Sequence, residues 1–272
     1  MIRALFFDLD GTLLNDDKRI SQANMAALSA CRAQGIRLFL ATARPPRLDK
    51  MLGWPPEILQ LFDGGVYCNG AVLQLHGQTD CFYLPEKVAC DVAALAPSFA
   101  DVNFALQMPD NAHAFLHALD AFAYAPWGIE PKDVCPLFGA PFDRVLKILV
   151  FYNNLVDAKR CLPQELVQQL ETVCRAQAHF WLTDGGRVVQ IVSKEAGKAN
   201  GVKQLCSRLH LSRSEAAVFG DDHNDLEMLS SFENSVAMGN AVPAVQSAAR
   251  FVTRSNNADG VAFALCYLLD LA

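Results

Sequence analysis

The sequence lacks both an apolar run of membrane length and a recognisable cysteine pattern. The longest apolar stretch near its end, residues 260–269, is far shorter than the roughly 20 residues that span a bilayer. The nine cysteines are odd in number, lie far apart and include no Cys-x-x-Cys pair, which argues against a zinc site and a disulfide framework. We therefore expect a soluble, cytoplasmic protein whose thiols are free and buried.

Basic residues are also fewer than acidic residues. Lys and Arg number 23 against 29 Asp and Glu, which gives a net charge of −6. Such a chain has no general electrostatic attraction to nucleic acid or to an anionic membrane, so we expect neither as a partner. The absence of a P-loop, and of Gly-x-Gly-x-x-Gly after a strand, argues against nucleoside-triphosphate and dinucleotide binding by those routes. An anionic ligand would need a local arrangement that overcomes the overall field.

Apolar residues, by contrast, are plentiful. They make up 52% of the chain, and charged residues make up 19%. This balance supplies a core and excludes a disordered chain. The length of 272 residues fits one large domain or two ordinary ones. A monomer and a small homo-oligomer are both compatible with this composition.

Both ends of the chain have the pattern of an α/β protein. Residues 4–7 are a short apolar run, typical of a strand that is buried on both faces. Ser21 can cap a helix that Gly35 ends, and residues 36–41 form a second such run, which completes a βαβ unit. Strands and helices of this kind return at residues 198–209, 216–219, 235–238, 251–253 and 261–269. We therefore predict a Rossmann-like, doubly wound parallel sheet.

The middle of the chain breaks this alternation. Prolines are frequent there, residues 145–151 are strand-like, and Gly185-Gly186 marks a turn. We predict an inserted α+β domain at residues 84–187. It would divide a core that consists of residues 1–83 and 188–272.

Two acidic segments each follow a predicted buried strand. Asp8 and Asp10 follow the first strand, and because alternate residues of a strand share a face, their side chains point the same way. Gly220-Asp221-Asp222-His223-Asn224-Asp225 follows a later strand. In open α/β sheets, ligands bind beyond the carboxyl ends of the strands. Each segment alone is also compatible with a polar turn or a helix start.

If the two segments converge, their carboxylates crowd one edge of the sheet. The acids concerned are Asp8, Asp10, Asp221, Asp222 and Asp225. Like charges at close range are unfavourable unless a cation neutralises them. Oxygen ligands select a hard ion, so the sequence predicts Mg²⁺ at this edge.

Two further positions suit an anion. Thr42 follows the 36–41 strand and offers a hydroxyl group and backbone donors to a phosphate oxygen. Lys198 begins a predicted helix, where an ammonium group and a helix N-terminus together bind an anion. Taken alone, the Thr42 signal is weak and fits a simple strand-to-helix junction, and Lys198 is more simply a solvated lysine.

Together these segments resemble the haloacid dehalogenase (HAD) superfamily, and within it the Cof-type phosphatases with a large inserted cap. The resemblance rests on Asp8-Leu9-Asp10-Gly11-Thr12, Thr42, Lys198 and residues 220–225. Asn69-Gly70-Ala71 and residues 236–241 and 259–262 support it. It covers essentially the whole chain and is weakest in the insertion. It implies a catalytic core with an α+β cap that determines substrate specificity.

The resemblance implies a two-step mechanism. Asp8 would attack phosphorus and form an aspartyl-phosphate. Asp10 would protonate the leaving alkoxide and then deprotonate the water that hydrolyses the intermediate. Mg²⁺ would be held by the Asp8 carboxylate, the Asp10 backbone carbonyl and Asp221.

The resemblance also implies how the phosphoryl group is held. Its oxygens would be bound by Thr42, Lys198 and Asn224, and Asp225 would orient the site from behind these groups. Such groups supply the positioning and charge stabilisation that phosphoryl transfer requires.

The second motif departs from the family at one position. Ala43 stands where the family usually has Gly, which is tolerable if its φ is negative. The neighbouring Arg44 is a candidate substrate contact, with a structural ion pair as an equal alternative. Asn69 is a second candidate contact.

The expected activity is that of a Mg²⁺-dependent phosphatase. Its partner would be a small-molecule phosphate ester, namely a sugar phosphate or a phosphorylated cofactor such as FMN or pyridoxal phosphate. A phosphomutase of the same superfamily is one alternative. A non-catalytic protein that binds phosphorylated metabolites is another, although it would be expected to have lost Asp8, Asp10 or Asp221.

Overall fold

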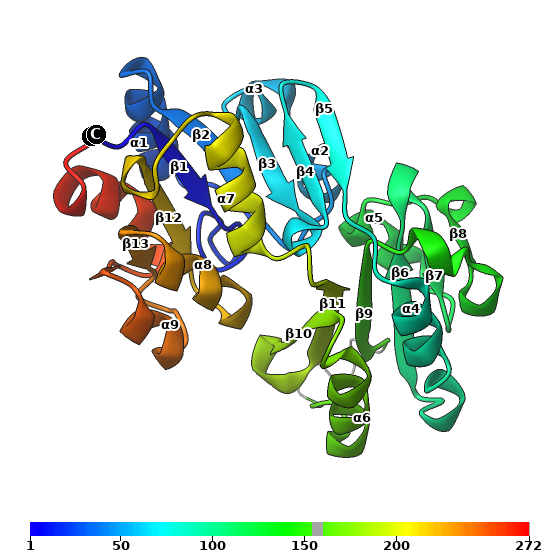
Figure 1. The fold of residues 1–272 in the computed structure, drawn as a ribbon. Coiled ribbons are helices and arrows are strands. Elements are labelled where there is room, and N and C mark those ends of the chain that lie inside the picture. Colours follow the sequence, from blue (N-terminus) through cyan, green and yellow to red (C-terminus); the bar gives the residue numbers. More distant parts are fainter. Residues whose placement is uncertain (154–159, 272) are drawn as a thin grey trace. The chain divides into compact units, whose positions relative to one another are not determined.

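A computed structural model describes residues 1–153 and 160–271 of the chain. It divides into two compact units, each of which contains its own sheet (Figure 1). The first unit comprises Met1–Asp49, Trp54–Asp80 and the chain from Lys198 onward. The second comprises Lys50–Gly53 and Cys81–Gly197.

The first unit is built on an eight-stranded sheet with the order β14-β13-β12-β1-β2-β3-β4-β5. The strands from β14 to β3 are parallel, and β3 and β4 form an antiparallel hairpin. The predicted Rossmann-like parallel sheet is therefore confirmed. The strands are β1 (Ala4–Phe7), β2 (Arg37–Ala41), β3 (Gly64–Tyr67), β4 (Val72–Leu75), β5 (Gln78–Cys81), β12 (Ala216–Gly220), β13 (Asn234–Ala237) and β14 (Phe251–Val252).

Helices connect these strands. Helix α7 packs on β2, β3 and β4, and α1 packs on β2. The hydroxyl oxygen of Ser21 accepts a hydrogen bond from the Asn24 backbone N–H at 3.1 Å, so Ser21 caps α1 as predicted. The helices are α1 (Gln22–Ala33), α3 (Pro56–Leu59), α7 (Lys198–Arg208), α8 (Leu226–Ser231), α9 (Pro243–Ala248) and α10 (Gly260–Phe263), and α2 (Leu48–Leu52) contains residues of both units.

Strand β1 lies in the centre of this sheet. All four of its residues are buried, which explains why they are apolar without alternation. Its Phe6 stacks on Phe39 of β2, and its Phe7 contacts Phe219 of β12. The parallel register places Phe7 opposite Leu40 and Phe219. The residues that follow these three strands therefore meet at one edge of the sheet.

The second unit has a six-stranded, mostly antiparallel sheet with the order β10-β11-β9-β6-β7-β8. Helices α4 (Glu86–Ala93), α5 (Tyr124–Trp127) and α6 (Gln164–Cys174) accompany it. The strands are β6 (Val102–Gln107), β7 (His113–Phe115), β8 (Val134–Pro136), β9 (Lys147–Tyr152), β10 (Ala178–Thr183) and β11 (Val188–Ser193).

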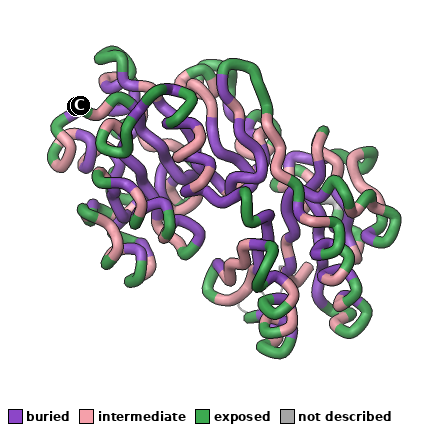
Figure 2. The backbone as a smooth tube through the Cα atoms, in the orientation of Figure 1, coloured by how far each residue is buried: buried purple, intermediate pink, exposed green. Residues whose placement is uncertain are grey.

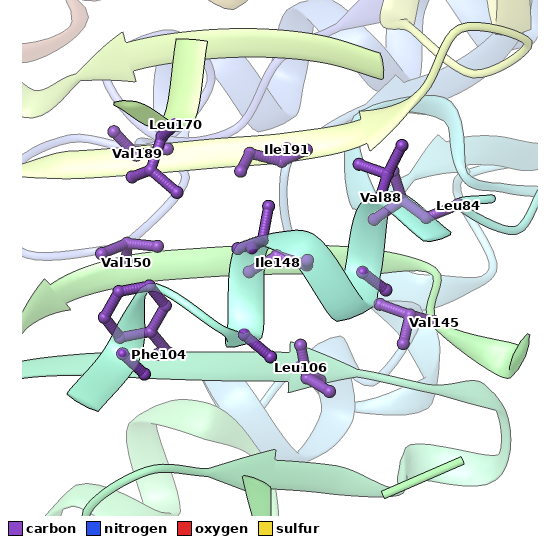
Figure 3. Close-up of a cluster of buried hydrophobic side chains, with 14 of the residues drawn as sticks. Leu84, Val88, Phe104, Leu106, Val145, Ile148, Val150, Leu170, Val189 and Ile191 are labelled. Carbon is purple, nitrogen blue, oxygen red and sulfur yellow. The ribbon is translucent and has the colours of Figure 1, made fainter. Parts of the chain in front are cut away.

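One face of this second sheet carries the core of the unit. Figure 3 shows Phe104, Ile148 and Ile191 among the side chains that meet there, together with Val88 of α4 and Leu170 of α6. In Figure 2 the central strands of each unit are largely buried, whereas turns and outer helix surfaces are exposed. Mixed strands and helices in one inserted unit agree with the predicted α+β type.

The boundary of the insertion differs from the predicted one. The second unit extends to Gly197 instead of residue 187. The reason is that β11, which directly follows residue 187, pairs with both β9 and β10 in the interior of the second sheet. It cannot belong to the parallel sheet of the first unit.

Two local features also differ from what the sequence favours: an Asn-Gly pair such as Asn69-Gly70 favours a two-residue hairpin turn, and the thiols are expected to be buried. The β3–β4 connection is a four-residue loop, residues 68–71, rather than a two-residue Asn-Gly turn. The nine cysteines, all within the described residues, form no disulfide, but only four are buried: Cys81, Cys135 and Cys266 are partly buried, and Cys90 and Cys161 are exposed. Within residues 1–153 and 160–271, every helix is too short or too polar to cross a lipid bilayer.

Candidate active site

The carboxyl edge of the first sheet gathers the predicted motif residues. Asp8 directly follows β1, Thr42 follows β2, and Asp221 follows β12. Lys198, the first residue of α7, reaches the same place. Asp8 and Thr42 are buried, and Lys198 is only 1% exposed. The first unit therefore brings these motif residues together at one edge of its sheet, as the sequence predicts.

Lys198 bridges two carboxylates. Its Nζ donates hydrogen bonds to Oδ1 of Asp8 and to Oδ1 of Asp225, each at 2.7 Å. Burial alone would lower the pKa of Lys198, but the carboxylates of Asp225 and Asp8 outweigh it and hold this pKa well above its usual range. Lys198 therefore carries a positive charge inside the site.

Asp225 organises the loop that follows β12. Its Oδ2 accepts hydrogen bonds from the backbone N–H groups of Asp221 and Asp222, at 3.0 and 3.2 Å. Because Oδ1 is held by Lys198, both of its oxygens are engaged. A Cβ atom on Gly220 would collide with the Asp225 side chain, so glycine is required there. Asp225 therefore positions the loop and the lysine.

Three acids lie close enough to share a cation. One oxygen each from Asp8, Asp221 and Asp225 lies within 4.8 Å of the others. The Thr12 hydroxyl donates to Oδ1 of Asp221 at 2.6 Å. Gly11, at φ +78, allows Asp221 to approach, since a Cβ atom there would collide with its carboxylate. The cluster contains carboxylate oxygens, the donors of a hard divalent ion.

The electrostatics of this cluster fit a cation. Burial raises the pKa of Asp8 to about 7, against the opposing effect of Lys198, and the charge of Asp225 adds to the increase. Burial and the neighbouring charges of Asp8 and Asp225 raise the pKa of Asp221 to about 8. A divalent ion between these two carboxylates would offset the cost of their desolvation and reduce their mutual repulsion.

Only three of the five expected acids join this cluster. The Asp222 carboxylate turns away and accepts a hydrogen bond from the His223 backbone N–H. The Asp10 carboxylate also turns away, to Arg44. The Asp10 carboxylate is stabilised by a cationic side chain, and the Asp222 carboxylate by a backbone N–H group.

Asp10 is held by two cations. Arg44 donates from Nε to Oδ2 at 2.6 Å and from Nη2 to Oδ1 at 2.7 Å, and Lys18 donates to Oδ1 at 2.8 Å. Burial alone would raise the pKa of Asp10, but Arg44 and Lys18 outweigh it and lower this pKa to about 2. Asp10 is therefore ionised in these contacts. Of the two roles expected for Arg44, a substrate contact and a structural ion pair, the structure shows the ion pair.

Thr42 and Arg44 lie on a tightly bound loop. The Arg44 backbone N–H donates to the Thr42 hydroxyl oxygen at 3.1 Å. From the β3–β4 loop, the backbone N–H groups of Cys68 and Asn69 donate to the carbonyl oxygens of Arg44 and Thr42. Between them, Ala43 has no positive φ, so the methyl group in place of glycine causes no backbone strain there.

The two asparagines of the site pair with each other. Nδ2 of Asn224 donates to Oδ1 of Asn69 at 3.0 Å. Asn69 is fully buried and has a left-handed backbone at φ 54. It is placed to hold Asn224, which retains 8% exposure.

The sequence pattern alone indicates no separate role for Thr12, Lys18 or Asn240. Thr12 lies in the first motif, and its contact with Asp221 depends on a fold that the motif alone does not specify. Asn240 lies in the supporting segment 236–241 and donates to the Gly11 carbonyl oxygen at 2.8 Å. Lys18 stands in a polar turn, where no spacing distinguishes it from other surface lysines.

Comparisons with known proteins extend over nearly the whole chain. A family model described as haloacid dehalogenase-like hydrolase matches residues 5–265. The Bacillus subtilis protein named "Putative phosphatase YxeH" is 30% identical, over 97% of this chain and 97% of its own. From the same organism, "5-amino-6-(5-phospho-D-ribitylamino)uracil phosphatase YitU" is 28% identical, over 94% of this chain and 93% of its own.

The fold has solved counterparts. A sugar phosphatase of HAD subclass IIB matches with a TM-score of 0.83 over 98% of this chain and 99% of its own, at 22% identity. A phosphatase of the same superfamily from Bacteroides thetaiotaomicron matches with a TM-score of 0.78, at 23% identity. These matches establish the fold, and the family model and relatives cover both units. The chain belongs to the haloacid dehalogenase-like hydrolases, among the phosphatases of that family.

Proposed function

We propose that this phosphatase hydrolyses small phosphorylated metabolites through an aspartyl-phosphate on Asp8 and depends on Mg²⁺. The observation that carries the proposal is the buried contact of Lys198 with Asp8, beside a second acid, Asp221. A carboxylate attacks a phosphate dianion only where positive charge offsets their repulsion. Lys198 supplies one such charge.

The proposed metal ligands are the Asp8 carboxylate, the Asp10 backbone carbonyl and Asp221. A bound Mg²⁺ would neutralise charge on the nucleophile and on the phosphoryl oxygens. Asp225 is not proposed as a direct ligand, because Lys198 and two backbone N–H groups engage both of its oxygens.

The chain's own groups account for the bonds that change. Asp8 forms a bond to phosphorus as the ester P–O bond breaks, and the leaving oxygen takes a proton from Asp10. Water then attacks phosphorus, the bond to Asp8 breaks, and Asp10 takes the water proton. Asp10 is ionised in its resting contacts, the form required for the second step. The negative charge of a bound phosphate dianion would raise the pKa of Asp10 and so favour the protonated form that the first step requires.

Thr42, Lys198 and Asn224 are proposed to hold the phosphoryl oxygens. Thr42 and Lys198 lie at the carboxyl edge where phosphate would meet Asp8. Asn224 is fixed by Asn69 at 3.0 Å, which gives Asn69 a supporting role rather than direct contact. We also propose a cytoplasmic location and a monomer or small homo-oligomer.

Relatives support the class of substrate. One is named for a phosphoribityl-aminouracil and a structural counterpart for a sugar phosphate, so both act on a phosphate attached to a polyhydroxylated chain. We propose a sugar phosphate or a phosphorylated cofactor such as FMN or pyridoxal phosphate for this chain. The second unit, as a cap, would select the leaving group.

Phosphate release from a panel of these metabolites tests the proposal. We expect the protein to release phosphate from at least one of these metabolites and from p-nitrophenyl phosphate. EDTA should lower the rate of release about tenfold or more, and added Mg²⁺ should restore it. Isomerisation of a hexose phosphate without release would instead identify a phosphomutase. Tight binding of a metabolite without turnover would identify a non-catalytic binding protein.

Mg²⁺ should stabilise the protein more at pH 8 than at pH 6. The pKa values of Asp8 and Asp221, raised from 3.8 to about 7 and about 8, mean that the folded, metal-free protein holds protons that the unfolded chain releases. Metal-free stability therefore declines as pH rises from about 4 to about 8, and Mg²⁺ must displace fewer protons at the upper end.

Thermal unfolding at one subsaturating Mg²⁺ concentration measures this effect. The rise in melting temperature over an EDTA control should be larger at pH 8. Equal rises at both pH values would contradict the assignment of these two acids as metal ligands. Asp8→Asn should reduce the rise at both.

A further inference from the structure

The Asp10 carboxylate is held more firmly than its partial exposure would suggest. Its side chain is 38% exposed, yet both oxygens are engaged. Arg44 forms a bidentate pair at 2.6 and 2.7 Å, and Lys18 adds a third contact at 2.8 Å. A carboxylate has about four lone-pair positions. One position, on Oδ2, is left for a leaving oxygen or a water molecule.

Arg44 is itself fixed in place. Its side chain is 16% exposed, and its backbone is held on both sides, by the Thr42 hydroxyl and by the Cys68 N–H. The planar guanidinium matches a carboxylate with two parallel hydrogen bonds, so it sets an orientation as well as a charge. A flexible surface arginine would set neither.

Lys18 reaches Asp10 from a separate turn. It has a left-handed backbone at φ 59, uncommon for a lysine, and its N–H donates to the Asn15 carbonyl oxygen at 2.9 Å. The Asp16 carboxylate accepts hydrogen bonds from Asn256 and Asn257, which ties this turn to the end of the chain. The lysine is therefore presented by a structured loop.

We infer that Arg44, assisted by Lys18, is a positioning residue that orients Asp10 toward the leaving group. The inference rests on the proposed function, in which Asp10 transfers the proton. One negative and two positive charges also leave a net positive charge beside the ester oxygen, where negative charge develops as the bond breaks. Arg44 would thus act on the departure of the alcohol and not on phosphoryl binding.

Two substrates of similar size separate these roles. p-Nitrophenyl phosphate releases a phenolate that departs without a proton, whereas p-nitrobenzyl phosphate releases an alkoxide that requires one. Arg44→Met should lower kcat/KM for the benzyl ester about tenfold or more beyond its effect on the phenyl ester. Arg44→Lys keeps the charge but loses the planar fork, so its selective loss should be smaller.

A double-variant cycle shows whether Arg44 acts through Asp10. Asp10→Asn alone should cause the same selective loss, and Arg44→Met added to it should cause no further selective loss. Arg3→Met is the matched control, because Arg3 precedes the opposite end of β1 and pairs with Glu215. It should leave both rates unchanged, and thermal unfolding should show that every variant is folded.

Three results would overturn the inference. Equal losses for the two esters would assign Arg44 to phosphoryl binding. Additive selective losses in the double variant would show that Arg44 does not act through Asp10. In both cases a wild-type protein that hydrolyses the esters leaves the proposed function intact. A wild-type protein that hydrolyses neither ester nor any metabolite would overturn the proposed function, and this inference with it.

Discussion

Asp8→Asn will lower phosphate release from p-nitrophenyl phosphate by roughly 10⁴-fold or more, because the amide cannot act as the nucleophile. The fold should survive the change. Burial raises the pKa of Asp8 to about 7 despite Lys198, so the ionised side chain is disfavoured where it lies. A neutral amide of the same size removes repulsion with Asp225. We expect the metal-free variant at pH 8 to melt no lower than the wild type.

The intermediate provides an independent measurement. Wild-type protein quenched during turnover should gain the mass of one phosphoryl group on the peptide that contains Asp8, and the variant should not. Asp91→Asn is the matched control, since Asp91 pairs with Lys87 at 2.7 Å on the exposed surface of α4. It should behave as wild type. Full activity in Asp8→Asn would contradict the nucleophile, and early unfolding would assign Asp8 to structure.

The strand ends of the site were predictable because local sequence controls them. An apolar run such as residues 4–7 is compatible with a buried parallel strand and stops where Asp8 begins. The same holds before Thr42 and Asp221. Parallel strands bring such ends to one edge, so convergence follows once the fold class is recognised.

The partners within the site were not predictable in the same way. Lys198 contacts Asp8 and Asp225, which lie 190 and 27 residues away in sequence. No periodicity relates residues at such separations. For Arg44 the sequence left a substrate contact and an ion pair equally open, and only the packing of Asp10 against it distinguishes them.

Tertiary contacts also explain two local errors. Asn69-Gly70 favours a two-residue turn, but Cys68 and Asn69 both adopt left-handed conformations and their N–H groups bind the loop that follows β2. Strand β11 is as apolar as a strand of the parallel sheet, and its placement beside β9 is decided by sheet order, which local pattern does not encode.

Lys198→Met will both destabilise and inactivate the protein. Removing the ammonium group leaves the carboxylates of Asp8 and Asp225 buried without their counter-charge. Breaking a buried ion pair from one side typically costs about 3–5 kcal/mol. We expect a loss of that order in the free energy of unfolding at neutral pH, and a roughly 10²–10³-fold loss of kcat from the missing charge at the phosphoryl group.

The control and a compensating variant separate these two effects. Lys203→Met, on the same helix, removes a 30% exposed lysine that lies 3.7 Å from Glu227, and it should change stability by about 1 kcal/mol or less. Adding Asp225→Asn to Lys198→Met removes one of the two buried carboxylates that lack a counter-charge, so part of the lost free energy of unfolding should return. The rate should not return, because the charge that offsets the nucleophile's repulsion is still missing. Equal stability of the two lysine variants would contradict this account, as would a rate restored with the fold.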